Sequence, residues 1–255
     1  MKLLIKLGGT LLDAPESRAR LAREITEIAR THAVTVVHGG GKQMTRYLAE
    51  RKVESHFVNG LRVTTPEVID AVLKVFAGTV NTELVGAFRD AGAKPVGLTG
   101  LDAALVDAEH LNPKLGAVGK PVHSDPAILN LLTVNHFLPV VACVAGDPSG
   151  RAYNVNADQM AVACAAAFQA EKLIFLTDVD GVKGSQGELL SSLSITGAQQ
   201  FIQQGVATGG MQAKLEAAIL ALQKGVPEIT IAPGGQPAAL RDILENKTIG
   251  TRIIN

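Results

Sequence analysis

Strong charge and long apolar runs are both missing from this sequence. Charged residues make up 19% of its 255 residues, below the roughly 25% that is typical of soluble domains. The 24 basic residues balance the 24 acidic ones, and no long basic run concentrates positive charge. We therefore expect no nucleic-acid partner. No apolar stretch approaches the ~20 residues needed to span a bilayer, and we expect neither a membrane segment nor a signal peptide.

Cysteine is scarce as well. Cys143 and Cys164 form no CxxC motif, and both lie in apolar stretches. Such isolated cysteines are usually buried thiols, so a redox or zinc centre is not indicated. Free thiols are typical of a reducing compartment, which predicts a cytoplasmic protein.

The familiar nucleotide motifs are absent too. No GxGxxG occurs in the chain, and Gly41-Lys42 lacks the upstream glycine and the following Ser or Thr of a Walker A loop. These absences argue against a dinucleotide-dependent oxidoreductase and against a P-loop enzyme.

What remains is an α/β pattern. Hydrophobic residues make up 47% of the chain, and the sequence alternates strand, glycine loop and helix, which predicts a mostly parallel central sheet. A capped helix should start at Thr65-Pro66, and a lobe boundary is expected near residue 170. We predict strands at 2–7, 34–37, 94–98, 104–107, 138–144, 173–177, 227–232 and 252–254, and helices at 21–29, from 42, at 66–91, 156–168, 210–224 and 237–245.

Two glycine loops follow the first two strands, Gly8-Gly9 and Gly39–Gly41. Without Cβ atoms, such loops let backbone N–H groups approach an anion, and the helix that follows each one adds its positive end. Ligands bind at the carboxyl ends of strands in open parallel sheets. The pair therefore favours an anion site over two ordinary tight turns.

Lys6 interrupts the otherwise apolar first strand, two residues before a glycine loop. Lysine is rarely buried unless it is paired, so this position favours a functional role. An edge-strand lysine that reaches solvent is the alternative.

Three further segments concentrate polar residues. Asn154, Asn156 and Asp158 alternate, so in an extended segment they would share one side, although helix capping can explain one of them. Lys214 follows Gly209-Gly210 in the early turns of a helix, where a cation is unfavourable without an anion nearby. Thr177–Gly181 has the character of a ligand loop at a strand end, or of an ordinary Asp-rich turn.

Taken in order, these segments resemble the acetylglutamate kinase family of the amino acid kinase superfamily, and the resemblance covers nearly the whole chain. The motifs that carry it are Lys6–Gly9, His38–Gly41, Asn59–Thr64, Leu115–Gly119, Asn154–Asp158, Thr177–Gly181 and Gly209–Met211 with Lys214. Each motif is weak alone, but the shared order is specific.

The resemblance implies an open αβα sandwich with two lobes. Residues 1–170 would bind the acyl amino acid and form a homodimer, and residues 171–255 would bind ATP. The implied reaction moves a phosphoryl group from ATP to the side-chain carboxylate of N-acetyl-L-glutamate, a step of arginine biosynthesis. Mg²⁺ would be held mainly by the nucleotide phosphates, with no metal ligand from the protein. Because a carboxyl group of this type has a pKa of ~4.3 in water, it is already ionised at neutral pH, and the chemistry requires no general base.

By resemblance, Lys6 and Lys214 bracket the transferring phosphoryl group, and Asp158 holds the two lysines. Arg62 and Asn154 would grip the substrate, with backbone N–H groups of Gly40 and Gly41. The implied phosphate and nucleotide contacts are Gly8, Gly9, Asp178, Val179, Asp180, Gly181, Val182, Lys183, Val206, Ala207 and Thr208. Val182-Lys183-Gly184 departs from the family's usual acidic or apolar residues at this point.

The alternatives are a related kinase of carrier-bound aminoadipate or another acidic amino acid, and a non-catalytic protein on the same fold. Asn59–Thr64 favours acetylglutamate, and the presence of Lys6, Asp158 and Lys214 together argues against a non-catalytic protein. Arginine-sensitive members carry an extra helix before the first strand, where this sequence has only Met1. We therefore expect a homodimer that L-arginine does not inhibit.

Overall fold

The protein is built around one eight-stranded sheet. The computed structural model describes all residues from 1 to 255. From one edge to the other, the strands are β12 (Ser192–Ser194), β14 (Thr251–Ile254), β13 (Glu228–Pro233), β11 (Lys172–Thr177), β1 (Lys2–Leu7), β2 (Ala33–His38), β8 (Leu138–Ala142) and β5 (Pro95–Leu98). Strands β13 to β5 are parallel to one another, and β14 turns antiparallel to β13. The expected α/β fold with a mostly parallel sheet is confirmed.

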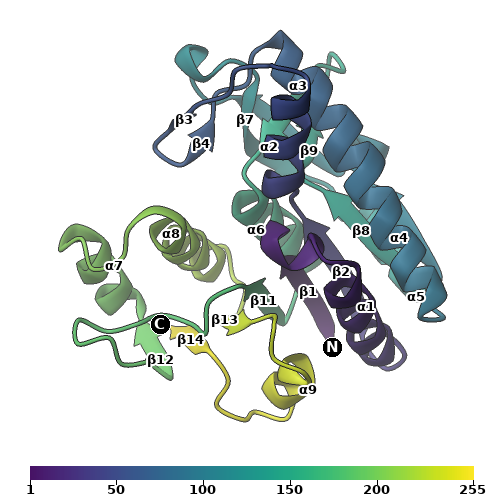
Figure 1. Cartoon of the computed structure of the whole chain (residues 1–255). Helices are drawn as coiled ribbons and strands as arrows, with labels where there is room; N and C mark the ends of the chain where they lie inside the picture. Colours follow the sequence, from purple (N-terminus) through teal and green to yellow (C-terminus); the bar gives the residue numbers. More distant parts are fainter.

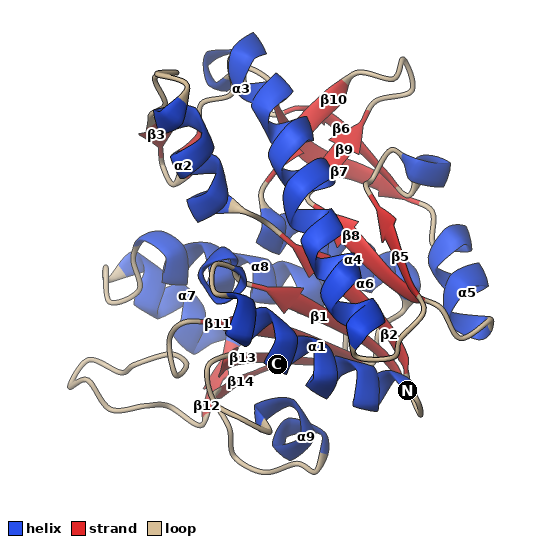
Figure 2. Ribbon diagram, turned by 45° about the vertical axis from the view of Figure 1, so that its right-hand side comes forward, coloured by secondary structure: helices blue, strands red, loops and turns tan.

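Helices cover both faces of this sheet (Figures 1 and 2). They are α1 (Pro15–Ala29), α2 (Gly41–Glu50), α3 (Pro66–Val72), α4 (Asn81–Asp90), α5 (Ala127–Val134), α6 (Ala157–Phe168), α7 (Ile195–Gln203), α8 (Gly209–Gln223) and α9 (Ala239–Leu244). α1 packs with α4 and α9 on one face, while α5, α6 and α8 cover the other. Central strands buried on both faces need continuous apolar runs, and Leu3, Leu4 and Ile5 of β1 have no exposed surface.

The predicted helix from Pro66 is confirmed, with a local change of pitch. Thr65 accepts a hydrogen bond from the N–H of Val68 as the N-cap of α3. A π-helical segment, Leu73–Val80, then joins α3 to α4. Such segments are rare and often lie at functional sites.

The predicted strand at 104–107 is wrong at its start. Ala103 and Ala104 adopt left-handed backbone angles, with φ of 53° and 51°, which a strand cannot accommodate. The extended segment is instead β6 (Val106–His110), in a separate small closed sheet with β7 (Val118–Ser124), β9 (Val144–Gly146) and β10 (Ala152–Val155). The predicted strand 138–144 is divided between β8 and β9, and a hairpin of β3 (Phe57–Val58) and β4 (Leu61–Arg62) was not predicted.

Three central strands end side by side. Leu7 of β1 lies in register with His38 of β2, and the next strand, β11, is aligned with β1 through Leu7 and Leu176. The loops that follow, at Gly8, Gly39 and Asp178, therefore lie together at the carboxyl ends of these strands. No helix of the structure combines the length and the apolar character needed to cross a membrane.

Candidate functional site

The two glycine loops pack backbone to backbone. The N–H of Gly8 donates to the carbonyl of Leu176 at 2.9 Å, which fastens the first loop to β11. A Cβ atom at Gly9 would lie 3.1 Å from the backbone nitrogen of Gly41, and one at Gly40 would lie 2.8 Å from the ring of Phe76. The contact at Gly40 is closer than a real Cβ atom allows, and the one at Gly9 is tighter than most, so this spacing favours glycine at both positions.

Lys6, Asp158 and Lys214 form a charged trio. Lys6 Nζ lies 2.6 Å from Asp158 Oδ1, and Lys214 Nζ lies 3.5 Å from Asp158 Oδ2. The side chains of Lys6 and Asp158 are 8% and 6% exposed. Strand β1 lies between β2 and β11, so the edge-strand alternative for Lys6 is wrong. The solvated alternative for Lys214 is also excluded, because 16% of its side chain is exposed.

The trio carries one net positive charge. Burial alone would raise the pKa of Asp158, but the charges of Lys6 and Lys214 outweigh it and lower that pKa below its ordinary value. The carboxylate is thus ionised at neutral pH, and two cations share one anion. Such a group attracts a further anion.

Asn154, Asn156 and Asp158 do not lie on one side of an extended segment. β10 ends at Val155 and α6 begins at Ala157, so the alternation stops between them. Asn156 caps α6, because its Oδ1 accepts from the N–H groups of Asp158 and Gln159. The expected capping role applies to this residue, and it orients the turn that carries Asp158.

A cavity of about 740 Å³ opens over the glycine loops. The three charged residues of the trio do not line it, but Gly9, in the loop after Lys6, and Ala157, next to Asp158, belong to its wall. The other lining residues are Thr10, Asp13, Gly39, Gly40, Gly41, Lys42, Thr45, Arg46, Ala49, Phe57, Gly60, Leu61, Arg62, Phe76, Val118, Cys143, Asn154, Val155 and Asn156.

Arg62 is a buried cation without an acidic partner. Only 8% of the residue is exposed, and no carboxylate forms a salt bridge with it. It donates to Ser55 Oγ, to Thr45 Oγ1 at 2.7 Å and to the carbonyl of Gly41 at 3.3 Å, and its guanidinium stacks 4.5 Å from the ring of Phe57. Burial lowers the pKa of Arg62 from its ordinary value. A buried arginine in this state fits a carboxylate ligand, which supplies the missing negative charge.

Asn154 faces the same cavity. Its Nδ2 donates to Thr64 Oγ1 at 3.0 Å, and Thr64 in turn donates to the carbonyl of Arg62 at 2.8 Å. This chain orients the amide so that its oxygen is the free end. A carbonyl-type acceptor at this place suits an N–H donor of a ligand.

The proposed nucleotide segments lie at the next strand end. Asp178, Val179, Asp180 and Lys183 are exposed after β11. Thr208 is the N-cap residue of α8, and Val206 is 37% exposed. None of these residues lines the 740 Å³ cavity.

Two of the proposed nucleotide-binding residues are buried and hydrogen-bonded to other parts of the protein. The side chain of Val182 is buried, and its N–H donates to Thr251 Oγ1 at 2.8 Å. Ala207 is buried too, and its N–H donates to the carbonyl of Phe201. Both residues can shape a nucleotide site only through the backbone conformation of their loops.

Several residues in the cavity wall or directly behind it had no clear signal in the sequence. Cys143 lies in the wall, and burial raises its pKa to about 12, so it is a neutral thiol at physiological pH. Thr45 and Ser55 hold Arg62, and Phe76 lies behind Gly40. Ser55 is seven residues from Arg62, but Thr45 is 17 residues from it, and only the fold brings Phe76 to Gly40.

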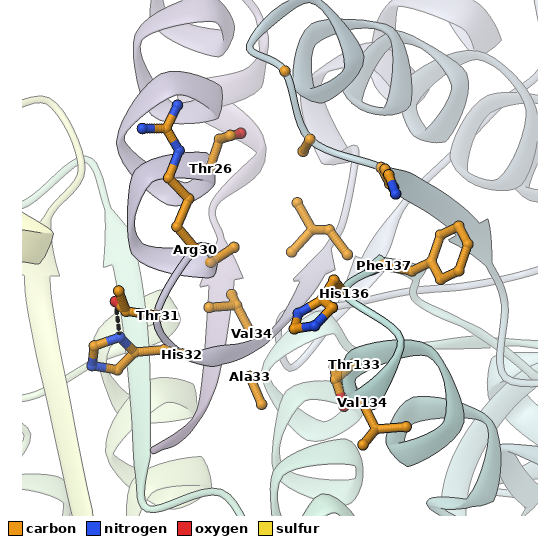
Figure 3. A pocket seen from close by; sticks show the side chains of 15 residues that line it. Thr26, Arg30, Thr31, His32, Ala33, Val34, Thr133, Val134, His136 and Phe137 are labelled. Atoms are coloured by element: carbon orange, nitrogen blue, oxygen red, sulfur yellow. Dashed lines mark hydrogen bonds between the residues drawn. The ribbon is translucent and has the colours of Figure 1, made fainter.

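A second cavity of about 550 Å³ lies at the opposite ends of the strands (Figure 3). Arg30, Lys94 and His136 contribute to its wall, and they follow the last turns of α1, α4 and α5. Arg30, directly after α1, complements the negative end of that helix. No residue of the glycine loops and none of Lys6, Asp158 and Lys214 lines this second cavity.

Comparison with known proteins gives a consistent result. Residues 1–233 match the model of the amino acid kinase family. The chain is 60% identical to an acetylglutamate kinase of Solibacter usitatus over 255 residues, covering 100% of this chain and 99% of that protein. It is 40% identical to an acetylglutamate kinase of Acidobacterium capsulatum, again covering 100% and 99%.

Two solved structures share the fold. An N-acetylglutamate synthase of Neisseria gonorrhoeae, complexed with coenzyme A and N-acetyl-glutamate, superposes with a TM-score of 0.89 at 25% identity, and the match covers 100% of this chain and 59% of that one. A carbamate kinase of Giardia lamblia bound to AMP-PNP gives 0.75 at 18% identity, with 100% and 98% covered.

Proposed function

The chain belongs to the amino acid kinase family, and we propose from this premise that it phosphorylates the side-chain carboxylate of N-acetyl-L-glutamate with ATP. The observation that carries the proposal is Arg62, a buried cation with no acidic partner, in the wall of a cavity that also contains Ala157. Ala157 is the chain neighbour of Asp158, the carboxylate that Lys6 and Lys214 share. The full-length acetylglutamate kinase relatives support the same substrate. In arginine biosynthesis, this reaction makes N-acetyl-L-glutamyl 5-phosphate.

The obstacle in this reaction is electrostatic, because a carboxylate must approach a polyphosphate. A carboxylate oxygen attacks the γ-phosphorus, the bond to the β,γ-bridging oxygen breaks, and ADP leaves. Charge therefore has to be neutralised on both partners, and a general base is not required. Lys6 and Lys214 bracket the transferring group as fixed cations, and Asp158 holds both of them in place without quenching both charges.

Substrate recognition follows from the cavity wall. Arg62 takes the α-carboxylate with its remaining N–H donors. Asn154 accepts from the amide N–H of the acetylated nitrogen with its free oxygen, while Gly40 and Gly41 offer backbone N–H groups near the side-chain carboxylate. Free glutamate carries an ammonium group in place of this amide, and its positive charge would lie in the same cavity as the Arg62 guanidinium, which has no acidic partner. This repulsion favours the acetylated substrate.

In this proposal, ATP binds at the loop after β11 and the segment before α8. Its base and ribose lie against Asp178–Lys183 and Val206–Thr208, and its phosphates reach Gly8 and Gly9 at the glycine loop. The chain has no group of three or more His, Cys, Asp or Glu side chains arranged to hold a metal ion. We propose that Mg²⁺ would be bound mainly by the phosphate oxygens, which this ion prefers, and would neutralise their charge.

We also propose the two lobes, residues 1–170 for the acyl amino acid and dimerisation and residues 171–255 for ATP. The sheet continues between them where β1 pairs with β11. A homodimer in the cytoplasm completes the proposal, and two buried free cysteines agree with a reducing compartment.

A hydroxamate assay tests the function directly, since hydroxylamine traps an acyl phosphate. ATP, Mg²⁺ and a panel of N-acetyl-L-glutamate, glutamate, aspartate, 2-aminoadipate and carbamate should give strong product with N-acetyl-L-glutamate alone. Equal product with free glutamate or aminoadipate would reject the substrate assignment and leave the family assignment intact.

A further inference from the structure

His38, the residue before the glycine triplet, is completely buried and fully hydrogen-bonded. Its Nδ1 lies 2.8 Å from the carbonyl oxygen of Gly39, and its Nε2 lies 3.0 Å from Nδ2 of Asn81. Asn81 is the first residue of α4, directly after the π-helical segment. The ring therefore connects a helix to the loop that lines the cavity.

The hydrogen-bond partners determine which nitrogen of His38 carries the proton. Asn81 Nδ2 also lies 2.9 Å from the carbonyl oxygen of Val140, and a carbonyl can only accept. The Asn81 atom that faces Val140 must therefore be the amide nitrogen. One of its hydrogens is donated to Val140, and the other points at His38 Nε2. That nitrogen must accept, so His38 is neutral and carries its hydrogen on Nδ1, which donates to Gly39.

The hydrogen bond that His38 Nδ1 donates fixes the orientation of the peptide between Gly39 and Gly40. In a trans peptide the carbonyl and the N–H point in opposite directions. The carbonyl of Gly39 is held toward His38, so the N–H of Gly40 points away from it. Gly40 lines the cavity whereas His38 and Asn81 do not, and its N–H donates to no backbone acceptor of the chain.

The surroundings leave this arrangement little freedom. Phe76 and Val80 of the π-helical segment pack against Gly40, where a Cβ atom would lie 2.8 and 3.2 Å from them. On the other side of Asn81, a Cβ atom at Gly97 would lie 2.1 Å from the Asn81 oxygen. Glycine at both places allows the amide and the loop to approach this closely.

We propose that His38 and Asn81 are positioning residues, which aim the N–H of Gly40 at the reacting oxygens where the carboxylate meets the transferring phosphoryl group. This inference rests on the proposed function. His38 never contacts substrate; it acts through the Gly39–Gly40 peptide. Preorganised donors of this kind are worth most when their direction is fixed before the reaction.

Two matched substitutions separate this role from simple packing. An asparagine at 38 can place its amide nitrogen where Nδ1 was and keep the donor to Gly39, but it loses the acceptor for Asn81. A glutamine places its amide near Nε2 and keeps the acceptor, but it loses the donor to Gly39. Both are uncharged amides, and each removes a different one of the two hydrogen bonds of His38.

We expect His38→Asn to keep kcat within about threefold of the wild type, and His38→Gln to lower kcat by about 10- to 100-fold, the usual effect of removing a group that orients a catalytic one. Both KM values should change far less than kcat. Of the two variants, His38→Asn should have the lower melting temperature, because the side chain of Asn81 loses its buried hydrogen-bond acceptor. Equal kcat values, or a loss of kcat that follows the loss of stability, would overturn the proposal.

The histidine tautomer gives a test that needs no substrate. Nitrogen-15 NMR of the wild-type protein should show His38 with its hydrogen on Nδ1 throughout pH 5.5 to 8.5. A hydrogen on Nε2, or titration in this range, would overturn the inference even if the enzyme is active. Conversely, a wild-type protein with this tautomer but no activity on N-acetyl-L-glutamate would reject the proposed function instead.

Discussion

Lys6 Nζ lies 2.6 Å from Asp158 Oδ1, and both side chains are more than nine-tenths buried. A strand residue and a helix residue from distant parts of the chain thus form an ion pair inside the protein. Neither charge could remain there alone, because an unpaired buried ion is strongly unfavourable. The approach of Lys214 to the same carboxylate makes Asp158 the common partner of both cations.

Replacing Asp158 by Asn should reduce both stability and activity. It leaves Lys6 without a counter-charge, which typically costs about 3–5 kcal/mol of the free energy of unfolding. kcat should fall about 10- to 100-fold because both lysines lose their common anchor. Urea unfolding and saturating kinetics measure the two effects. Asp70→Asn, which removes an exposed ion pair with Lys74, is the control and should change stability by less than about 1 kcal/mol.

Lys6→Ala and Lys214→Ala should each lower kcat by about 10²–10³, the usual loss for one preorganised group. Their stabilities should differ, because Lys6 is the closer and more deeply buried partner of Asp158. We therefore expect the lower melting temperature for Lys6→Ala. Near-normal kcat in either variant at saturating substrate would remove that lysine from the proposed mechanism.

Arg62→Lys should raise KM for N-acetyl-L-glutamate far more than KM for ATP. Lysine keeps the charge but cannot hold Thr45 and Ser55 while it grips a carboxylate with two parallel hydrogen bonds. Initial rates with each substrate varied in turn will separate the two constants. Similar increases in both would place Arg62 outside the acyl amino acid site.

Gly40→Ala should damage catalysis, whereas Gly86→Ala should not. At Gly40 the new methyl group would meet the Phe76 ring at 2.8 Å and push the loop away, while Gly86 has nothing within 4 Å. Gly86 lies inside α4, where alanine stabilises a helix by roughly 0.5–1 kcal/mol. Comparison of kcat and melting temperature for the pair distinguishes a local effect on the loop from a general effect of adding a methyl group.

Stability should depend on pH through His38. Burial lowers its pKa from 6.5 to about 4, so between these values the unfolded chain binds a proton that the folded protein does not. Stability is therefore fully present above pH 6.5 and falls as the pH drops toward 4, by about 1.4 kcal/mol per unit at most. Asp158 acts in a lower window, since its pKa lies below 3.8.

Urea unfolding at several pH values between 4 and 7 measures this slope. His38→Asn lacks the titrating ring, so its stability should vary less with pH than that of the wild type over the same range. Contributions from His32 and the carboxylates are common to both proteins and cancel in the difference. Parallel curves for the two proteins would show that His38 does not titrate as expected.

Local patterns in the sequence were enough for most of the fold. Apolar runs located β1, β2 and β11, and the Thr65-Pro66 pair located the start of α3, because caps and short-range periodicity depend on neighbouring residues. The strand at 104–107 failed for a local reason of another kind: two alanines adopt left-handed angles that their residue type does not signal.

The candidate residues themselves were also visible in the sequence. Lys6 stood out as a charge in an apolar strand, and Arg62 and Lys214 belonged to motifs in a specific order. Their roles in phosphoryl transfer remain proposals, but residue type and order along the chain were sufficient to select them.

Tertiary structure alone decided how these residues meet. The position of β1 between β2 and β11 buries Lys6 instead of leaving it at an edge. The start of α6 at Ala157 turns Asn156 into a cap and Asp158 into the partner of two lysines. The contact of His38 with Asn81 requires α4 to pack over the end of β2. Strand order and helix packing arise from burial across the whole chain, and a local pattern contains no information about which distant side chain will fill the space beside it.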